Sequence, residues 1–369
     1  MFPFSKSDKL LIVAPHPDDE SLATGGLLQR AFASQIPVRI LFGTKGENNP
    51  WAQRFWERRW KIGPDERKGW GERRRQEALN AISVLGGKPD CARFLNLPDQ
   101  GITRLLMKGD PELLVLFAKE IEKWLPTLVV IPSMLDAHPD HSALSVVLSA
   151  VLDSFGNAPI QTWEYLVHEP QIAITRQPKT VRLSLRLSSE EVYCKLKAIL
   201  CHKTQVALSR GRFTRFSKVE EAYCRHDPTG VTTHDGSLLA VRACEGVLHL
   251  RISIDPHDRL GSEILLAFRS SASEMHGWRI PLSLWSGFAP ILDATSGWRL
   301  HDATVRWGAS GLTVGIPLVA MRNFDAVFIK LSGWTLFFDR SGWWRVSVTS
   351  GRASGLTNRP KPAGLMTLS

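Results

Sequence analysis

The sequence predicts two domains: an α/β domain whose mostly parallel, Rossmann-like sheet is flanked by helices, and a C-terminal β-sandwich-like domain. The first prediction depends on apolar, strand-like runs that alternate with helix-like segments up to about residue 153. The second depends on a change after residue 230, where Gly, Ser and Asp separate short alternating runs. We therefore place the α/β domain at residues 1–226, the β-rich domain at 230–350 and a flexible basic tail at 351–369.

The expected elements of the α/β domain alternate between strand and helix. Strands are predicted at residues 10–14, 38–42, 92–97, 128–131 and 162–168, and helices at 21–33, 72–85, 112–125, 142–152 and 189–201. Gly86 and Gly87 end the second helix, because glycine readily adopts the left-handed backbone of a helix C-terminus. Pro126 ends the third helix, and Ser188 or Ser189 caps the last. A parallel sheet of this kind binds ligands beyond the carboxyl ends of its strands.

The β-rich domain contains short strand-like runs and many tryptophans. The runs cover residues 238–243, 247–254, 264–268, 313–316, 326–331 and 335–338. Tryptophan recurs at Trp278, Trp285, Trp298, Trp307, Trp334, Trp343 and Trp344. We favour the interpretation that these side chains fill a core, as large aromatic residues usually do. Exposed tryptophans would instead form a carbohydrate-binding surface.

Composition limits the class of protein and its partners. The chain has 369 residues, 43% hydrophobic and 22% charged, which is typical of a globular protein. Its formal net charge of +10 favours anionic partners, although no nucleic-acid-binding motif accompanies that charge. The five cysteines form no CxxC pair, so we expect reduced thiols and a cytoplasmic location. No signal peptide and no run long enough to span a bilayer is recognisable, which leaves at most peripheral membrane contact.

Two similar runs of His, Pro and Asp follow two of the predicted strands. His-Pro-Asp-Asp-Glu occupies residues 16–20 after the strand at 10–14, and His-Pro-Asp-His occupies residues 138–141 after the strand at 128–131. A single run of this kind is most often only a loop or a helix cap. Two matching runs at the carboxyl ends of two strands instead predict one metal site assembled from both.

The residue types in these runs supply metal ligands and a base. His16 and Asp19 can reach one ion from a single loop, and His141 can supply the third ligand of a catalytic zinc site. Two histidines and one carboxylate also suit ferrous iron. Asp18 would stand beside the ion and take the proton from its bound water.

The second run also contains groups that would act on the substrate. His138 would face the other side of the substrate, where an imidazolium can stabilise an oxyanion or protonate a leaving amine. Asp140 would orient a neighbouring histidine by accepting its second N–H. Glu20, the third carboxylate of the first run, is interpreted as a residue at the start of the helix or behind the ligands. The remaining histidines, His168 among them, have no paired carboxylate pattern.

These runs resemble the two signature motifs of the PIG-L/LmbE-like zinc-dependent N-deacetylases. The resemblance covers about residues 8–226 and consists of Pro-His-Pro-Asp-Asp-Glu at 15–20, His-Pro-Asp-His at 138–141, Arg74-x-x-Glu77, Phe-Leu-Asn-Leu-Pro-Asp at 94–99 and His202-x-Thr204-Gln205. Pro15 stands where the family more usually has Ala, and Thr204 where it more usually has Ser. Members of this family remove the acetyl group from N-acetylglucosaminyl compounds.

The resemblance implies a role for each residue of the two motifs. The Zn²⁺ ligands would be His16, Asp19 and His141. The catalytic groups would be Asp18 as general base, His138 as general acid or oxyanion stabiliser, and Asp140 as the residue that orients His138. Arg74 and Asp99 match positions that line the sugar site, and the alternative for both is a buried ion pair or a helix cap. The expected protein is a zinc-dependent hydrolase of linear amide bonds that deacetylates an N-acetylated amino-sugar conjugate, and the basic charge favours an anionic one.

Two other functions are weighed against the deacetylase. A metal-dependent phosphoesterase usually needs further ligands for a second metal, and the sequence has no second carboxylate-rich cluster. A carbohydrate-binding protein with a degenerate deacetylase domain is disfavoured, because the set of His and Asp residues is intact.

The segment from Trp51 to Trp70 is basic and rich in aromatic residues. One helix face could carry Trp51, Phe55, Trp56 and Trp60, with Arg54, Arg58 and Lys61 turned away. The segment is interpreted as a helix packed on the domain, as a lid over the substrate, or as a helix at a membrane interface. We favour the packed helix.

Overall fold

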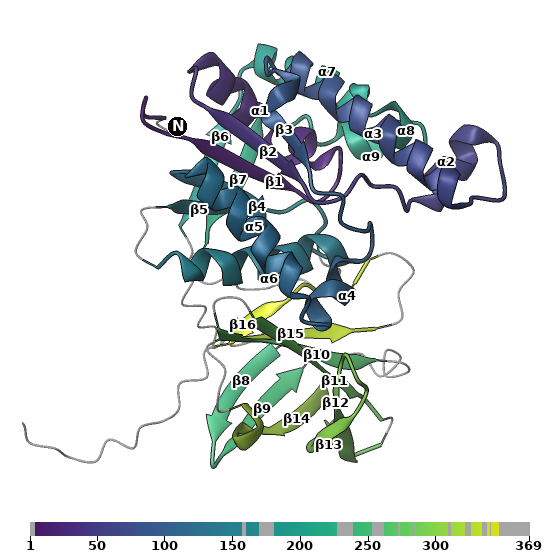
Figure 1. Ribbon diagram of the computed structural model, residues 1–369, viewed down its shortest axis with the longest axis vertical. Helices are drawn as coiled ribbons and strands as arrows, with labels where there is room; N and C mark the ends of the chain where they lie inside the picture. The colour runs from purple at the N-terminus through teal and green to yellow at the C-terminus, as the bar shows by residue number, and fades with distance from the viewer. Residues whose placement is uncertain are drawn as a thin grey trace, which may run out of the picture.

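The computed structural model describes residues 4–156, 160–169, 181–226, 239–252, 262–271, 274–283, 285–308, 311–321, 326–333, 338–339 and 341–346. Two sheets lie at opposite ends of the molecule, and the helices surround one of them (Figure 1). The predicted tail at 351–369 and the predicted strand residues 335–337 lie outside the described residues. None of the helices in the described ranges is long and apolar enough to cross a membrane.

The first sheet is mostly parallel, as predicted. Its seven strands in the described residues have the order β3-β2-β1-β4-β5-β7-β6. The parallel strands are β1 (Leu10–Ala14), β2 (Val38–Phe42), β3 (Ala92–Phe94), β4 (Leu128–Pro132) and β5 (Gln161–Tyr165), and the antiparallel ones are β6 (Arg182–Arg186) and β7 (Glu220–Arg225). The chain moves from one side of β1 to the other between β3 and β4. The junction of β1 and β4 is therefore the topological switch point, where sheets of this kind bind ligands.

Helices cover both faces of this sheet. Leu10 and Ile12 of β1 pack with α1 (Asp19–Ala33), α3 (Pro64–Val84) and α7 (Ser189–Cys201). Leu11 and Val13 point to the other face and pack with α4 (Ile102–Met107), α5 (Pro111–Trp124) and α6 (Pro139–Ser154). The remaining short helices are α2 (Pro50–Glu57), α8 (Lys203–Val206), α9 (Arg210–Thr214) and the 3-10 turns Pro89–Cys91 and Leu318–Met321. Burial on both faces explains why β1 and β4 are unbroken apolar runs.

Most elements of the α/β domain match the prediction within a few residues. α7 has the predicted bounds, and the Ser188 hydroxyl caps it by accepting a hydrogen bond from the N–H of Glu191 at 3.2 Å. α3 begins at Pro64, earlier than predicted, because the end of the basic segment continues it. The sequence analysis missed α4, α8, α9 and the antiparallel strands β6 and β7, because each is only four to six residues long; β6 alternates polar and apolar residues, but over five positions only.

The second sheet is antiparallel throughout its described pairings. Its nine strands in the described ranges have the order β16-β15-β10-β11-β12-β13-β14-β9-β8. They are β8 (Leu239–Cys244), β9 (Val247–Ile252), β10 (Glu263–Ser271), β11 (Glu274–Pro281), β12 (Gly287–Asp293), β13 (Arg299–Gly308), β14 (Gly311–Pro317), β15 (Ala326–Ser332) and β16 (Trp344–Val346). The sheet curls around a core that includes Leu250, Phe268, Ile291, Val314 and Ile329. The β-sandwich-like prediction is confirmed in this form, as one sheet that curls over its own core.

Of the seven tryptophans named for this region, Trp307 is partly buried and Trp334 lies outside the described residues, and the others divide into two groups. Trp278, Trp343 and Trp344 are buried, as the core interpretation predicts. Trp285 and Trp298 are 78% and 77% exposed, so that interpretation is wrong for them.

The outer face of the second sheet packs on the helices of the first domain. Phe328 of β15 and Trp343 belong to the same buried cluster as Phe117 of α5 and residues of α4 and α6. Gly277 of β11 lies so close to α4 that a Cβ there would be 2.0 Å from Met107 O, which only glycine permits. The two sheets therefore share one buried cluster, and the predicted domain boundary between residues 226 and 230 stays a prediction.

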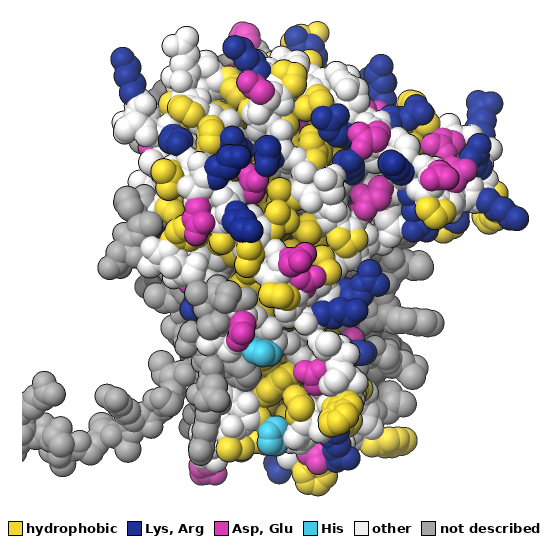
Figure 2. Space-filling view, viewed as in Figure 1, with side chains coloured by type: hydrophobic (Ala, Val, Ile, Leu, Met, Phe, Trp, Pro, Cys, Tyr) yellow, Lys and Arg dark blue, Asp and Glu magenta, His cyan; other side chains and the backbone are white. Residues whose placement is uncertain are grey.

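The tryptophan-rich segment packs on the domain through Ala52 and Gln53 of α2 (Pro50–Glu57) but leaves most of its aromatic rings exposed. α2 extends at one side of the molecule, where Figure 2 shows Lys, Arg and apolar side chains together (Figures 1 and 2). Trp51, Phe55 and Trp60 are 50%, 60% and 75% exposed. The guanidinium carbon of Arg54 lies 5.2 Å from the Trp51 ring centroid and 5.1 Å from that of Trp60. The packed-helix interpretation is wrong for these rings, and it holds for the inner face of α2 and for Trp70, which is buried in α3.

Candidate active site

The two predicted loops meet at the carboxyl ends of β1 and β4. Residues 15–18 lead from β1 into α1, and residues 133–138 lead from β4 into α6. Because β1 and β4 pair in parallel, both loops leave the sheet at the same edge. The histidine and aspartate side chains of both loops and of the adjoining helix starts are brought together there, and His16, Asp19, Asp140 and His141 are all buried.

Three donor atoms of the predicted ligands form a nearly equilateral triangle. His16 Nδ1 lies 3.4 Å from Asp19 Oδ2 and 3.3 Å from His141 Nε2. Asp19 Oδ2 lies 3.2 Å from His141 Nε2. A tetrahedral zinc ion with bonds of about 2.0–2.1 Å needs ligands roughly 3.3–3.4 Å apart. The donor set therefore fits a tetrahedral metal that binds three protein atoms and has a fourth corner left.

Carboxylates hold the outer nitrogen of each of these histidines. His16 Nε2 lies 3.1 Å from Asp99 Oδ1 and 3.3 Å from Asp140 Oδ2. His141 Nδ1 lies 3.2 Å from Asp136 Oδ2. An imidazole that donates its outer N–H to a carboxylate turns the lone pair of its other nitrogen toward a metal. These contacts therefore assign the tautomers in which both rings direct a lone pair into the triangle.

Asp140 orients a different histidine from the one expected. Its carboxylate contacts His16 and accepts hydrogen bonds from the backbone N–H groups of Gln100 at 2.6 Å and Ile102 at 3.0 Å. Among the described contacts, Asp140 reaches His138 only through its backbone N–H, which donates to His138 Nδ1 at 3.2 Å. The expectation that the Asp140 carboxylate orients His138 is wrong, because the turn at residues 100–102 holds that carboxylate toward His16.

Two members of the cluster were not expected from the sequence. Asp136 Oδ2 accepts hydrogen bonds from His141 and from the N–H groups of Val167 at 3.0 Å and His168 at 3.1 Å, which ties the second loop to the end of β5. The His168 ring centroid lies 5.0 Å from that of His141. The signal that could have found His168 is its place directly after a parallel strand. The same signal applies to Asp136, which follows the parallel strand β4 in the loop that leads to α6.

The buried carboxylates set the charge of the two ligand histidines. Burial opposes the charged form of His16, but hydrogen bonds to carboxylates, that of Asp140 first, raise its pKa well above the ordinary value. Burial also opposes the charged form of His141, and the charges of Asp19 and Asp136 overcome it and raise its pKa to about 10. Despite its own burial, the pKa of Asp19 is lowered by His141. The carboxylates therefore favour a positive charge at this point, supplied either by protons on the two rings or by a metal cation that replaces those protons.

Asp18 stands beside the ligands in a strained backbone position. Its φ of 143° lies in a region that residues with side chains rarely adopt. Arg74 donates to Asp18 Oδ2 at 3.1 Å and to Pro17 O at 2.8 Å. Burial, against the opposing charge of Arg74, raises the pKa of Asp18 to about 6. A carboxyl group that ionises near neutral pH is suited to general base catalysis.

Arg74 and Asp99 are only 4% and 8% exposed. Arg74 forms the buried ion pair that was the alternative to sugar binding, and it also donates to Gly46 O at 2.9 Å. Asp99 accepts from the N–H of Asn48 at 2.7 Å while it contacts His16. Both side chains therefore hold loops around the cluster, and their contact with a sugar stays a prediction.

His138 caps α6 and is neutral. Its Nδ1 accepts the hydrogen bond from Asp140 N, which leaves the ring proton on Nε2. Burial first, and then the charges of His16 and His141, lower its pKa well below the ordinary value. The expected imidazolium is therefore contradicted, and His138 has an Nε2–H donor instead.

A second layer of buried groups lies behind the first loop. Glu20 lies 2.9 Å from His202 Nε2 and accepts from the N–H of Asp18 at 3.0 Å, so its predicted place behind the ligands is confirmed. Glu77 accepts from the backbone N–H of Thr204 at 3.0 Å and from its hydroxyl at 2.6 Å. The hydroxyl of Thr204 thus makes a contact that a serine would also make.

Residues 11–152 match the sequence profile of the PIG-L family, described as GlcNAc-PI de-N-acetylase. The chain contains a PIG-L family domain. The matched span of this domain includes both motifs and the whole donor triangle, whereas the C-terminal sheet lies outside it.

The PIG-L domain is similar to curated deacetylases. A 1D-myo-inositol 2-acetamido-2-deoxy-alpha-D-glucopyranoside deacetylase from Rhodococcus jostii (strain RHA1) is 31% identical over 166 residues, which are 41% of this chain and 55% of the relative. A protein of the same name from Gordonia bronchialis is 29% identical over 163 residues, 39% of this chain and 56% of the relative. The chain thus spans about half the length of the curated relatives that it matches. The solved structure of an A40926 pseudoaglycone deacetylase is 20% identical with a TM-score of 0.46, and the overlay covers 59% of this chain and 96% of that chain.

Proposed function

We propose that this protein is a metal-dependent deacetylase that hydrolyses the acetamide of an N-acetylglucosaminyl-type substrate. The observation that carries the proposal is the triangle of donors from His16, Asp19 and His141, with the Asp18 carboxyl group beside it. The names of the curated relatives, which are deacetylases of an acetamido-glucopyranoside, support an N-acetyl amino sugar as the substrate class.

We infer that zinc is the metal. Donor separations of 3.2–3.4 Å suit a tetrahedral ion, whereas octahedral geometry with the same bond lengths would need roughly 2.9 Å between neighbouring donors. This spacing favours zinc over ferrous iron. When bound, zinc would act as a Lewis acid and lower the pKa of water in the site to roughly 7.

The chain's own groups would move the protons of the reaction. Arg74 binds Asp18 Oδ2, which leaves Oδ1 to accept a proton from the attacking water. The water oxygen bonds to the acetamide carbon, and the His138 Nε2–H donates to the carbonyl oxygen as negative charge develops there. The C–N bond then breaks, and the amine leaves with the proton that Asp18 accepted. The products are acetate and the free amino sugar.

The test is the release of acetate and amine from N-acetylglucosaminyl substrates by the purified protein. We expect release that stops with a chelator and returns with zinc. No release from any such substrate by the zinc-loaded protein would overturn the proposal. Phosphate release from sugar phosphates, without acetate release, would instead support the phosphoesterase.

A further inference from the structure

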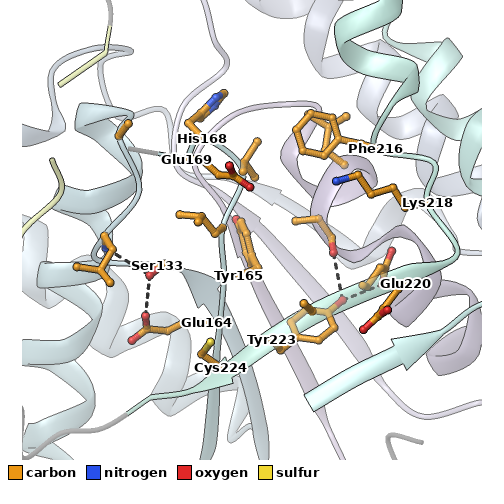
Figure 3. A pocket seen from close by; sticks show the side chains of 18 of the residues that line it. Ser133, Glu164, Tyr165, His168, Glu169, Phe216, Lys218, Glu220, Tyr223 and Cys224 are labelled. Carbon is orange, nitrogen blue, oxygen red and sulfur yellow. Dashed lines mark hydrogen bonds between the residues drawn. The ribbon is translucent and has the colours of Figure 1, made fainter. Parts of the chain in front are cut away.

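A cavity of about 770 Å³ lies beside the histidine cluster, at the side of β5 and β7. His168 lines it and connects it to the candidate active site, because its ring lies 5.0 Å from that of His141. Figure 3 shows His168 and Glu169 on one side of the cavity and Phe216 and Lys218 on the other. Among the histidines of the cluster, the cavity lining includes His168 alone.

The C-terminal region supplies part of the wall. Phe338 and Asp339 line the cavity, and the Phe338 ring centroid lies 4.9 Å from that of His168. The backbone N–H of Asp339 donates to Ala137 O at 2.8 Å, and its carboxylate lies 2.5 Å from Lys330 Nζ of β15. Contacts to both the second loop and the second sheet therefore hold the Phe338 ring beside the cluster.

Three cations at the cavity have no carboxylate partner among the described residues: Arg212, Arg215 and Lys218. The Arg212 guanidinium lies 5.2 Å from the Phe338 ring centroid, and one of its nitrogens lies 3.3 Å from His168 Nδ1. Partial burial and then the charge of Arg215 lower the pKa of Arg212 below its ordinary value, and the charge of Asp18 opposes this shift. Neighbouring like charges of this kind are stabilised when an anion binds between them.

Most carboxylates at the cavity already have partners. Glu221 lies 2.6 Å from Lys195 Nζ, and Glu164 lies 2.6 Å from His226 Nδ1. Glu220 and Asp339 are likewise engaged, by Ser184 and Lys330. Glu169 is exposed and has no partner within the described ranges. Glu220 and Glu164 keep their charge beside a hydroxyl and a histidine, so the whole lining carries five Lys or Arg and five Asp or Glu side chains. The positive charge is therefore local to the group of Arg212, Arg215 and Lys218.

We propose that Arg212, Arg215 and Lys218, together with the Phe338 ring, form a subsite for an anionic group, a phosphate or a carboxylate, carried by the substrate. The inference rests on the proposed deacetylase function, because it places the anion beyond a sugar whose acetamide is at the cluster. The ring offers an apolar surface to the sugar, and the guanidinium groups offer paired N–H donors to the anion. The C-terminal sheet thereby takes part in substrate selection.

The test compares three matched substrates: the methyl glycoside, the carboxymethyl glycoside and the 1-phosphate of N-acetylglucosamine. In the double variant Arg212→Gln/Arg215→Gln we expect KM for at least one anionic substrate to rise about tenfold or more, because charged hydrogen bonds are lost. The kinetics of the neutral methyl glycoside should change less than twofold. Arg210→Gln, on the same helix but outside the cavity lining, should change neither.

The two anionic substrates distinguish phosphate from carboxylate recognition. The single variant Arg212→Lys keeps a positive charge, so it should bind the anionic substrates better than the double variant does. Equal effects on all three substrates would overturn the subsite, provided thermal unfolding shows that the variant is folded. Calorimetric binding of the same compounds gives a readout without turnover. If no substrate is deacetylated but the anionic ones bind in an Arg212-dependent manner, the proposed function fails and the subsite stands. If they also bind no better than the methyl glycoside, both fail.

Discussion

Carboxylates from separate loops orient the two histidines of the donor triangle. Asp99 and Asp140 hold the outer nitrogen of His16, and Asp136 holds that of His141. Each contact removes the freedom of a ring to rotate or to change tautomer, so the site is formed before a metal arrives. Changes to these carboxylates should therefore affect metal affinity before they affect the fold.

The first prediction concerns Asp136, the carboxylate that the sequence analysis missed. Asp136→Asn should weaken zinc binding about 10–100-fold, because a neutral amide oxygen is a weaker acceptor for the His141 N–H than the carboxylate and makes the ring a less basic ligand. Competition with a chromophoric chelator measures this affinity. The control is Asp153→Asn. Asp153 lies near the end of α6 and forms ion pairs with Arg269 and Arg345 instead of contacting the donor triangle, so this variant should bind zinc normally. Unchanged affinity in folded Asp136→Asn would contradict the assigned role.

The second prediction separates metal binding from proton transfer. Asp18→Asn should keep one bound zinc yet lose at least about 100-fold in deacetylation rate, because the amide cannot accept the proton. Zinc content and acetate release are measured on the same sample. A variant with full activity would refute Asp18 as the base.

The third prediction concerns the pH dependence of a thiol. Burial, and then the charge of Asp90, raise the pKa of Cys91 to about 12. Because only the thiolate is nucleophilic, Cys91 of the folded protein should alkylate slowly from pH 7 to 9 and faster after unfolding in urea. Mass spectrometry of iodoacetamide-labelled peptides measures both rates. Equal rates in the two states would show that Cys91 is not protected.

At the scale of elements, buried polar contacts join helices that are far apart in the sequence. Glu77 of α3 accepts both the N–H and the hydroxyl of Thr204 at α8, and Glu20 of α1 meets His202 just before α8. These contacts attach the short α8, which has little apolar surface of its own, to the long helices around the site. The loss of a hydrogen-bond donor lowers the free energy of unfolding more when the carboxylate is buried than when it is exposed to water.

The fourth prediction follows from this attachment. Thr204→Val should lower the free energy of unfolding by about 1–3 kcal/mol, because it leaves a buried oxygen of Glu77 without its donor. Thr204→Ser keeps the hydroxyl and should be close to neutral. Urea unfolding monitored by tryptophan fluorescence compares the three proteins. A valine variant as stable as the serine variant would show that the hydrogen bond contributes nothing.

At the scale of the whole molecule, the second sheet serves as a cover for the helices of the PIG-L domain. Phe328 and Leu265 point from the sheet into the cluster formed by α4, α5 and α6, while Ile329 and Leu266 point into the sheet's own core. Strand alternation therefore gives one sheet two buried faces. The same arrangement places Phe338 at the cavity beside the histidine cluster.

The fifth prediction is that the PIG-L domain does not fold stably without this sheet. A chain that ends after residue 226 should expose the apolar surface of α4 to α6, bind a hydrophobic dye and aggregate. The full chain with Phe328→Leu, which keeps the contact surface largely apolar, is the control and should unfold in one cooperative transition. A truncated chain that stays monomeric and unfolds cooperatively would contradict the shared core.

The sequence by itself determined the elements and the chemistry that sit close together along the chain. Strand and helix periods, the caps at Ser188 and Gly86, and the paired motifs after β1 and β4 are all local patterns, and they predicted the parallel sheet and the three donor residues. Only the tertiary structure decided which carboxylate serves which histidine, since His16 meets Asp140 across 124 positions. It likewise decided that Asp136 and His168 join the cluster, and that Phe338 of the C-terminal region reaches it. The two motifs predicted that their loops meet, but the pairing of single side chains depends on how those loops are folded in space, which the order of residues along the chain does not specify.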